Sequence, residues 1–156
     1  MIHPMSEKKR ARYQRIQHQI KDLVEKNEDL ISRMATINAL LYHKMPGFFW
    51  VGFYLLKNNK LVVGPYQGPL ACLELPANKG VCWEGINAGK TVLVPDVHEF
   101  PGHIACDSRS KSEIVIPVRN SSNVIIGVLD IDSNLINNFD GVDAEELEKI
   151  IALLQN

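Results

Sequence analysis

The order of the periodic segments is the feature that most constrains the fold of this chain. Two stretches with apolar residues at helical spacing come first, a block of short β-type segments follows, and an amphipathic helical stretch closes the chain. Strands grouped between helices predict an α+β fold: an antiparallel sheet of about six strands, with the N- and C-terminal helices packed mainly on one face. A chain of 156 residues can bury one core, so we expect a single domain over residues 1–156.

Capping residues set the expected helix bounds. We expect Ser6 to cap the first helix and Asn27 or Asp29 to cap the second. Asp143, with Glu146 three residues later, predicts a capping box for the last helix, which should run antiparallel to the first. The buried stripe of the first helix is expected to be Tyr13, Ile16, Ile20, Leu23 and Val24.

Turn residues divide the central block into strands and one short helix. The expected strands cover residues 48–56, 61–66, 70–75, 91–94, 113–118 and 124–132, and the short helix covers 80–88. Residues 96–111 contain Pro101 and Gly102 and little periodicity, which predicts a long ordered loop. Loops of that length inside a compact domain are usually functional.

Composition excludes several classes of function. The net charge of −1 leaves no basic excess for nucleic acid or for an anionic membrane surface. The longest apolar runs, at 48–56 and 124–129, are far shorter than the roughly 20 residues that span a bilayer. The first residues lack the hydrophobic core of a signal peptide, so we expect a cytoplasmic protein whose cysteines serve chemistry or packing rather than structural disulfides.

The three cysteines are Cys72, Cys82 and Cys106. Their spacing lacks the short pairs of a structural zinc site, so we expect no metal. Free cysteines are often buried and inert, but Cys106 stands in the polar 96–111 loop. His103 and Arg109 would lower the pKa of Cys106 and Asp107 would raise it, so the sequence leaves the sign of the shift open.

Asp130 and Asp132 lie two residues apart in an expected strand, so both side chains point to the same face. An alternative is that both lie beyond the sheet edge and simply begin the following turn. If they lie in the strand, an antiparallel register brings Glu113 beside them, and the three carboxylates raise one another's pKa values. One protonated member would then protonate a leaving oxygen, and ionised neighbours would hold an ammonium group.

Trp50, Gly52 and Tyr54 also share one face of an expected strand. Two aromatic rings beside a glycine form a wall for a small apolar pocket, with room at the glycine. The alternative is an ordinary aromatic stripe in the core.

Several stretches carry a resemblance to a known family. They are Gly-Pro-Tyr-Gln-Gly at 64–68, Gly-Val-Cys at 80–82, the run at 96–107 that ends His-Ile-Ala-Cys-Asp, Ser-Glu-Ile-Val-Ile-Pro at 112–117, and Gly-Val-Leu-Asp-Ile-Asp-Ser at 127–133. Together they resemble the free methionine-(R)-sulfoxide reductases, which are built on a GAF domain.

The resemblance implies the GAF fold, free methionine-(R)-sulfoxide as substrate, thioredoxin as electron donor and no cofactor. By position, Cys106 matches the nucleophile and Cys72 the resolving thiol, with Cys82 as a second recycling thiol or an alternative resolver. The residues that match the substrate site are Glu113, Asp130 and Asp132 for its polar groups, and Trp50 and Tyr54 for its methyl side.

Trp83 departs from the family pattern, because many relatives carry a small residue after this cysteine. Its indole would alter the segment that carries Cys82. A homodimer formed through the first helices fits such folds. The competing interpretations are a GAF module that binds a small ligand, or a cysteine redox sensor without turnover; no effector domain is evident, and an acidic pocket suits a phosphate poorly.

Overall fold

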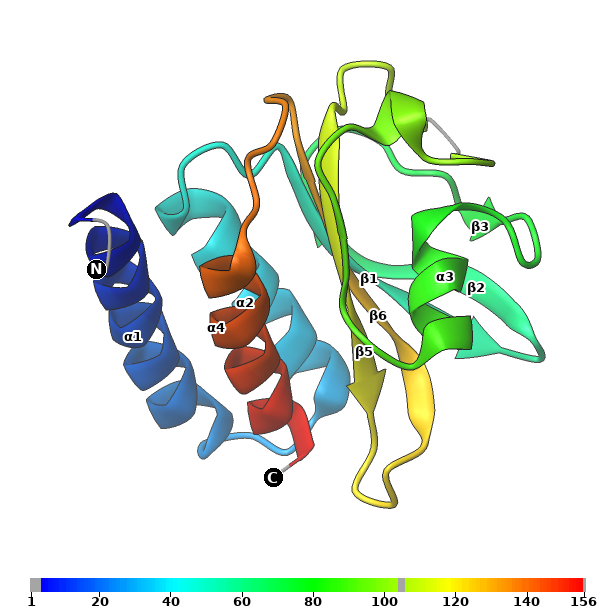
Figure 1. Cartoon of the computed structure of the whole chain (residues 1–156). Helices are drawn as coiled ribbons and strands as arrows, with labels where there is room; N and C mark the ends of the chain where they lie inside the picture. Colours follow the sequence, from blue (N-terminus) through cyan, green and yellow to red (C-terminus); the bar gives the residue numbers. More distant parts are fainter. Residues whose placement is uncertain (1–3, 104–105, 156) are drawn as a thin grey trace.

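A six-stranded antiparallel sheet, in the order β3-β2-β1-β6-β5-β4, separates two unequal layers in the computed structural model, which describes residues 4–103 and 106–155 (Figure 1). The strands are β1 (Trp50–Lys57), β2 (Lys60–Gln67), β3 (Glu74–Leu75), β4 (Val92–Val94), β5 (Ser112–Arg119) and β6 (Ile125–Ser133). The helices are α1 (Pro4–Val24), α2 (Leu30–Lys44), α3 (Gly80–Ala88) and α4 (Gly141–Ala152), with short 3-10 turns η1 (Val97–Glu99) and η2 (Leu153–Gln155). Helices α1, α2 and α4 cover one face and α3 lies over the other, which confirms the expected α+β architecture.

The helix caps match the expectations in part. Asp29 caps α2, since its carboxylate accepts a hydrogen bond from the Ser32 backbone N–H at 2.7 Å. Helix α4 has a capping box, but Asp140 is the cap and Asp143 its third residue, so the box predicted at Asp143 and Glu146 was wrong. Ser6 lies inside α1, which already begins at Pro4, a residue whose fixed φ suits a first turn.

Helix α1 runs parallel to α4, contrary to the antiparallel expectation. Lys9 and Tyr13 bind Asp143, and Gln17, one to two turns further along α1, binds Glu146, so the two helices advance together. The stripe of α1 is buried as predicted except for Leu23, which is exposed.

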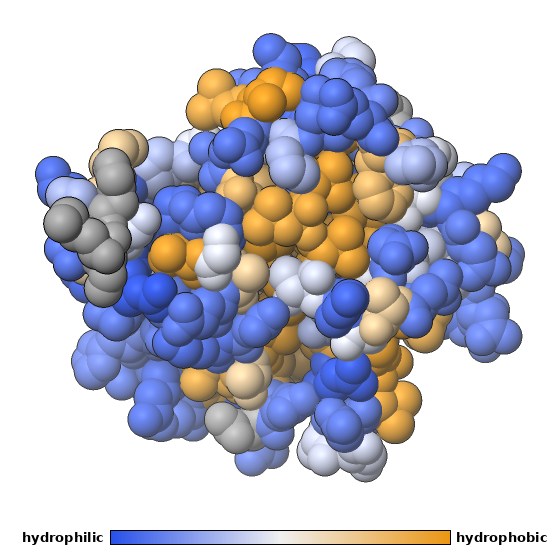
Figure 2. Space-filling model, viewed as in Figure 1, coloured by the Kyte–Doolittle hydropathy of each residue, from blue (hydrophilic) through white to orange (hydrophobic). Residues whose placement is uncertain are grey.

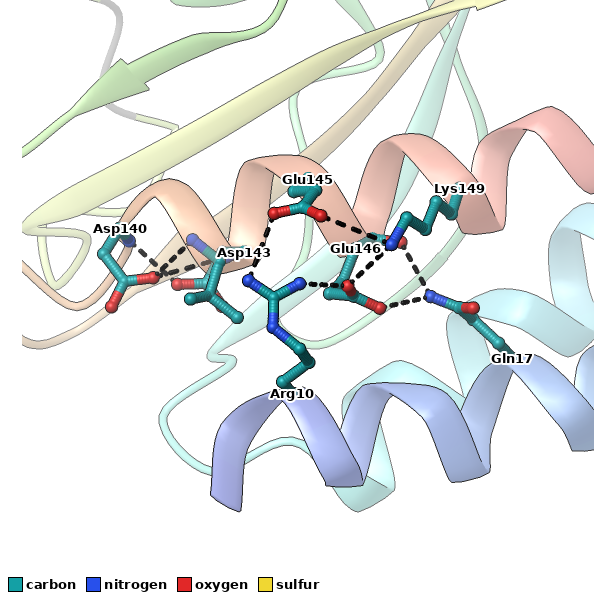
Figure 3. Close-up of polar contacts among 8 residues, drawn as sticks. Arg10, Gln17, Asp140, Asp143, Glu145, Glu146 and Lys149 are labelled. Carbon is teal, nitrogen blue, oxygen red and sulfur yellow. Dashed lines mark hydrogen bonds and ion pairs between the residues drawn. The ribbon is translucent and has the colours of Figure 1, made fainter. Parts of the chain in front are cut away.

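Two buried carboxylates of α4 have partners on α1, and Figure 3 shows those of Glu146. Glu146, which is completely buried, accepts hydrogen bonds from Arg10 at 2.6 Å, Gln17 at 2.6 Å and Lys149 at 3.0 Å. Asp143 is paired with Lys9 at 2.8 Å and also accepts from a buried tyrosine hydroxyl. Charges removed from water in this way persist because each has an opposite charge or a donor.

Strand alternation gives each sheet face its own core. Val51, Phe53, Leu129 and Ile131 point toward α1, α2 and α4, and the intervening residues point toward α3. Figure 2 shows hydrophilic side chains over α1 and an apolar area over the strands in the middle of the same view. None of the helices in the described part of the chain combines the length and apolar character that a bilayer span requires.

Candidate active site

The register of the sheet brings the three predicted carboxylates together on the face covered by α3. In β6, Asp130 pairs with Gly52 of β1, and Asp132 pairs with Glu113 of β5. Directly paired residues lie on the same face of a sheet, so the three acids are neighbours. Both aspartates lie within β6, which excludes the alternative that they lie beyond the sheet edge.

A pocket with an empty volume of about 590 Å³, including open solvent at its mouth, lies between these acids, α3 and the loop after η1. Its lining includes every site residue predicted from the sequence except Cys72. The lining residues are Phe49, Trp50, Tyr54, Leu70, Ala71, Leu75, Lys79, Gly80, Val81, Cys82, His103, Cys106, Asp107, Ser110, Glu113, Asp130 and Asp132.

Trp50 and Tyr54 line one side of the pocket, and Tyr66, which is outside the lining, stacks on Trp50. The Trp50 ring lies 5.8 Å from that of Tyr54 and 5.3 Å from that of Tyr66, both nearly parallel to it. A side chain at Gly52 would collide with Trp50 and Tyr66, so the space predicted at this glycine is filled by aromatic packing. Sequence reasoning missed Tyr66, and the signal available was its cross-strand pairing with Gly52.

The segment that carries Cys72 is held against this aromatic wall. Trp50 donates from its indole N–H to the carbonyl of Pro69, and the Tyr54 hydroxyl donates to that of Cys72, both at 3.1 Å. The expected strand at 70–75 is therefore wrong over most of its length. Because Pro69 and these side-chain bonds fix the chain in an irregular path, only β3 remains paired with the sheet.

Cys72 and Cys106 form a disulfide with their Cα atoms 5.5 Å apart. It connects the segment beyond β2 with the loop before β5, and the two residues are 34 apart in sequence. Of the His-Ile-Ala-Cys-Asp motif, residues 104 and 105 lie outside the described residues. The nucleophile and the resolving thiol expected from the family resemblance are thus within bonding distance.

Cys82 is different in kind from the bonded pair. It is a free, buried thiol in the first turn of α3. Burial, together with the nearby Asp130 and Glu113, raises its pKa well above the ordinary value, so it is a poor source of thiolate. Trp83, the next residue of α3, is buried in the same core cluster as Cys82.

The carboxyl groups of the acid cluster are buried, and not all of their oxygens have a hydrogen-bond partner among the described residues. Burial and the neighbouring Asp130 raise the pKa of Glu113 well above its usual range; burial and Asp130 do the same to Asp132. Burial also raises the pKa of Asp130, against hydrogen bonds from Glu113 and Cys82 that lower it. One oxygen of Asp130, Oδ1, is buried without a hydrogen-bond partner among the described residues.

No Lys or Arg of the described ranges, 4–103 and 106–155, forms an ion pair with these acids. The ring of His103 lies 3.7 Å from Glu113, but burial, followed by the nearby His98, lowers the pKa of His103. The lowered pKa of His103 and the raised pKa of Glu113 favour the neutral form of the imidazole and the protonated form of the carboxyl. Among the described residues, the acids of the cluster are therefore without a Lys or Arg ion pair, which leaves them able to pair with a cationic group of a ligand.

The Cys82 Sγ atom and one oxygen each of Glu113 and Asp130 lie within 4.8 Å of one another. Thiolate and carboxylate bind a metal only when deprotonated, and the raised pKa values of all three groups favour their protonated forms. The arrangement has the properties of a proton-holding acid cluster more than those of a metal centre.

Two opposite charges beside Cys106, those of Arg109 and Asp107, form an ion pair with each other. The Arg109 guanidinium contacts the Asp107 carboxylate at 2.7 and 3.0 Å and lies 4.8 Å above the ring of Phe49. The hydrogen bonds from Arg109 lower the pKa of Asp107 to about 2. The two opposite charges beside Cys106 are therefore paired with each other, and the sign of the shift in the pKa of Cys106 stays a prediction.

The N-terminus of α3 opens onto the same pocket. Gly80, Val81 and Cys82 line it, and the preceding Lys79 caps the helix without a side-chain hydrogen bond. The first backbone N–H groups of a helix have no partner within it and attract anions. Sequence reasoning missed Lys79, whose signal was its position just before the helix.

No family model matches the chain. It is 46% identical over 149 residues to GAF domain-containing protein A of Dictyostelium discoideum, covering 95% of this chain and 93% of the relative. It is 43% identical over 125 residues to the free methionine-R-sulfoxide reductase of Escherichia coli, covering 80% and 75%. The chain belongs to the free methionine-R-sulfoxide reductase family.

A solved structure of this family supports the same assignment. The free methionine-R-sulfoxide reductase of Neisseria meningitidis, in complex with its substrate, superposes with a TM-score of 0.90 at 42% identity, covering 94% of this chain and 88% of that chain. The expected GAF fold of the free methionine-R-sulfoxide reductases is confirmed.

Proposed function

We propose that this protein reduces free L-methionine-(R)-S-oxide to L-methionine. The observation that carries the proposal is a disulfide between Cys72 and Cys106, the second of which lines a pocket whose buried carboxyl groups have no Lys or Arg ion pair in the described chain. The names of the relatives and of the solved structure support the substrate, including its R configuration.

The geometry supports a nucleophilic mechanism. The Cys106 thiolate attacks the sulfoxide sulfur, and the protonated Glu113 donates its proton to the departing oxygen. The protonated oxygen then forms a bond to the Cys106 sulfur, and the bond between the Cys106 sulfur and the methionine sulfur breaks. Its electron pair leaves with methionine, and Cys106 remains as a sulfenic acid. The Cys72 thiol then displaces water from the sulfenic acid and forms the observed disulfide. In this assignment Cys72 resolves the intermediate, and the buried Cys82 does not.

Preference for the free amino acid follows from the acid cluster. Asp130 and Asp132, when ionised, pair with the α-ammonium group, and the N-terminus of α3 binds the α-carboxylate. Trp50 and Tyr54 contact the apolar end of the side chain. A methionine sulfoxide inside a peptide lacks the ammonium and would leave the Oδ1 atom of Asp130 buried without a partner.

Each turnover consumes two electrons and leaves a disulfide. We propose a thioredoxin-type dithiol as the reductant, by thiol–disulfide exchange, and the cytoplasm as the compartment because it keeps such dithiols reduced. Residues 1–156 act as one GAF domain in this proposal. A homodimer through the first helices stays a prediction, which light scattering after gel filtration checks.

Two serine variants test the assignment. Cys106→Ser abolishes release of methionine from the free R-sulfoxide, even in a single turnover, whereas Cys72→Ser completes one turnover and then stalls under thioredoxin recycling. Release of methionine by Cys106→Ser contradicts the assignment of Cys106 as the nucleophile. If the unaltered protein is oxidised by peroxide but consumes no NADPH with either sulfoxide epimer in a coupled assay, it is a sensor.

A further inference from the structure

The bonded Cys72 stands in an apolar surface segment. Residues 68–73 contain no charged side chain. Leu70 and Leu73, on either side of the disulfide residue, are 85% and 77% exposed, more than any other large exposed hydrophobic side chain in the described residues. Singly exposed leucines are common, but two that flank a reactive disulfide mark a contact surface.

The segment is also the edge of the sheet and is rigidly held. The carbonyl of Leu73 accepts a hydrogen bond from the N–H of Val63 at 2.9 Å, and β3 pairs with β2 alone. Trp50 and Tyr54 fix the carbonyls on the inner side. The outer side of the edge has no partner strand among the described residues, so a second protein can add main-chain hydrogen bonds there without reordering the segment.

We infer that residues 70–73 and β3 form the docking surface for the dithiol protein that reduces the disulfide, and that its thiolate attacks the sulfur of Cys72. The inference rests on the proposed function, because that function produces the disulfide in each turnover. The remaining cysteine outside the bonded pair, Cys82, is buried and cannot serve as the reductant. The thiol that reduces the disulfide must therefore come from another protein, which occupies the docking surface.

The position of the two sulfur-bearing residues favours attack at Cys72. Cys106 is the more exposed residue, but it lines the substrate pocket, whereas Cys72 does not line it and belongs to the apolar edge segment. A protein docked on Leu73 therefore meets Cys72 first.

The disulfide is reduced in two successive thiol–disulfide exchange steps. The partner's thiolate forms a bond to the Cys72 sulfur, the Cys72–Cys106 bond breaks, and Cys106 leaves as a thiolate. The partner's second thiol then loses its proton, and the resulting thiolate attacks the partner's first sulfur in the mixed disulfide. Cys72 leaves as a thiolate and takes up a proton, and the partner departs as a disulfide, having given two electrons.

Leu73→Ser tests the surface, because Leu73 does not line the pocket. We expect KM for thioredoxin to rise about tenfold, as for a loss of roughly 1.4 kcal/mol of apolar contact. Turnover with dithiothreitol as reductant should be unchanged. Val124→Ser, at a 56% exposed position in the β5–β6 hairpin, is the matched control and should change neither value.

The outcomes separate the two proposals. No sulfoxide reduction with dithiothreitol by the unaltered protein overturns the proposed function. Normal turnover with dithiothreitol and an unchanged KM for thioredoxin in Leu73→Ser overturns the docking surface alone. If Leu73→Ser instead converts a dimer to a monomer and leaves that KM unchanged, a second copy of this chain occupies the surface.

A trapping experiment tests the attacked sulfur. A thioredoxin whose second active-site cysteine is replaced by serine is mixed with the oxidised protein, and the mixed disulfide is mapped by peptide mass spectrometry. We expect the bond at Cys72; a bond at Cys106 overturns the assignment of the attacked sulfur.

Discussion

The two faces of the sheet treat buried carboxylates in opposite ways. Under the helices, Glu146 is completely buried and accepts hydrogen bonds from two cations and an amide. Over the other face, Glu113 and Asp130 are each 5% exposed and have one another, a thiol and an imidazole as neighbours. The carboxylates are buried to almost the same extent on the two faces. Among the described residues, only those under the helices have positively charged partners.

This difference distinguishes buried carboxyl groups with a structural role from those with a functional role. A buried carboxylate with its own cations stabilises a helix contact and needs nothing more. Buried carboxyl groups without a cation oppose folding, and such arrangements persist at sites that a ligand or a proton completes. The two regions therefore predict different outcomes for the same chemical change.

The largest expected effect is on activity, from Glu113→Gln. Loss of the proton donor should lower kcat/KM about 10²- to 10⁴-fold. The variant should be at least as stable as the unaltered protein, because an amide carries no buried charge. Steady-state kinetics with dithiothreitol and thermal unfolding measure both; a variant that keeps full activity contradicts the role of Glu113.

The matched variant on the other face, Glu146→Gln, should do the reverse. An amide cannot satisfy Arg10, Gln17 and Lys149 together, so the free energy of unfolding should fall by about 1–3 kcal/mol. Activity per folded molecule should be unchanged. Denaturant unfolding and kinetics check this, and a loss of activity without a loss of stability would break the comparison between the faces.

The pH dependence of stability should also distinguish the faces. Burial raises the pKa of Glu113 above its ordinary 4.5, so its protonated form stabilises the fold below that pH, and this contribution is lost as the pH rises through the raised value. The stability advantage of Glu113→Gln over the unaltered protein should therefore grow with pH. Unfolding at pH values on both sides of 4.5 measures it, and an advantage that shrinks with pH contradicts the raised pKa.

The smallest effect is expected at the exposed pair beside Cys106. In Arg109→Gln the pKa of Asp107 should rise from about 2 toward its ordinary 3.8, because the hydrogen bonds from Arg109 are lost. Global stability should hardly change, since exposed ion pairs contribute little. A titration of the Asp107 carboxyl carbon by NMR follows the shift, and an unchanged pKa would show that Arg109 does not hold this carboxylate in solution.

Strand alternation made the site predictable from the sequence. Period-two spacing placed Asp130 with Asp132 and Trp50 with Tyr54, and the hairpin register added Glu113. These relations are local or depend on adjacent strands, so a sequence pattern contains them.

The helix caps and the helix contact were less predictable. Asp143 and Glu146 fit a capping box by spacing alone, but α1 supplies partners for both, and Asp140 takes the cap. The parallel course of α1 and α4, and the irregular path before β3, depend on side chains distant in sequence. The Asp140 cap is a local pattern that competed with the one at Asp143, whereas tertiary contacts decided the helix course and the path before β3.

The most direct test of the acid cluster compares free L-methionine-(R)-sulfoxide with its N-acetyl derivative, using dithiothreitol as reductant. If the unpartnered Oδ1 atom of Asp130 binds the ammonium group of the substrate, the unaltered protein should prefer the free amino acid by about 10³-fold or more in kcat/KM. Asp130→Asn should lose most of that preference. Equal kcat/KM values for the two substrates with the unaltered protein would contradict the central claim that the acid cluster selects a free amino acid.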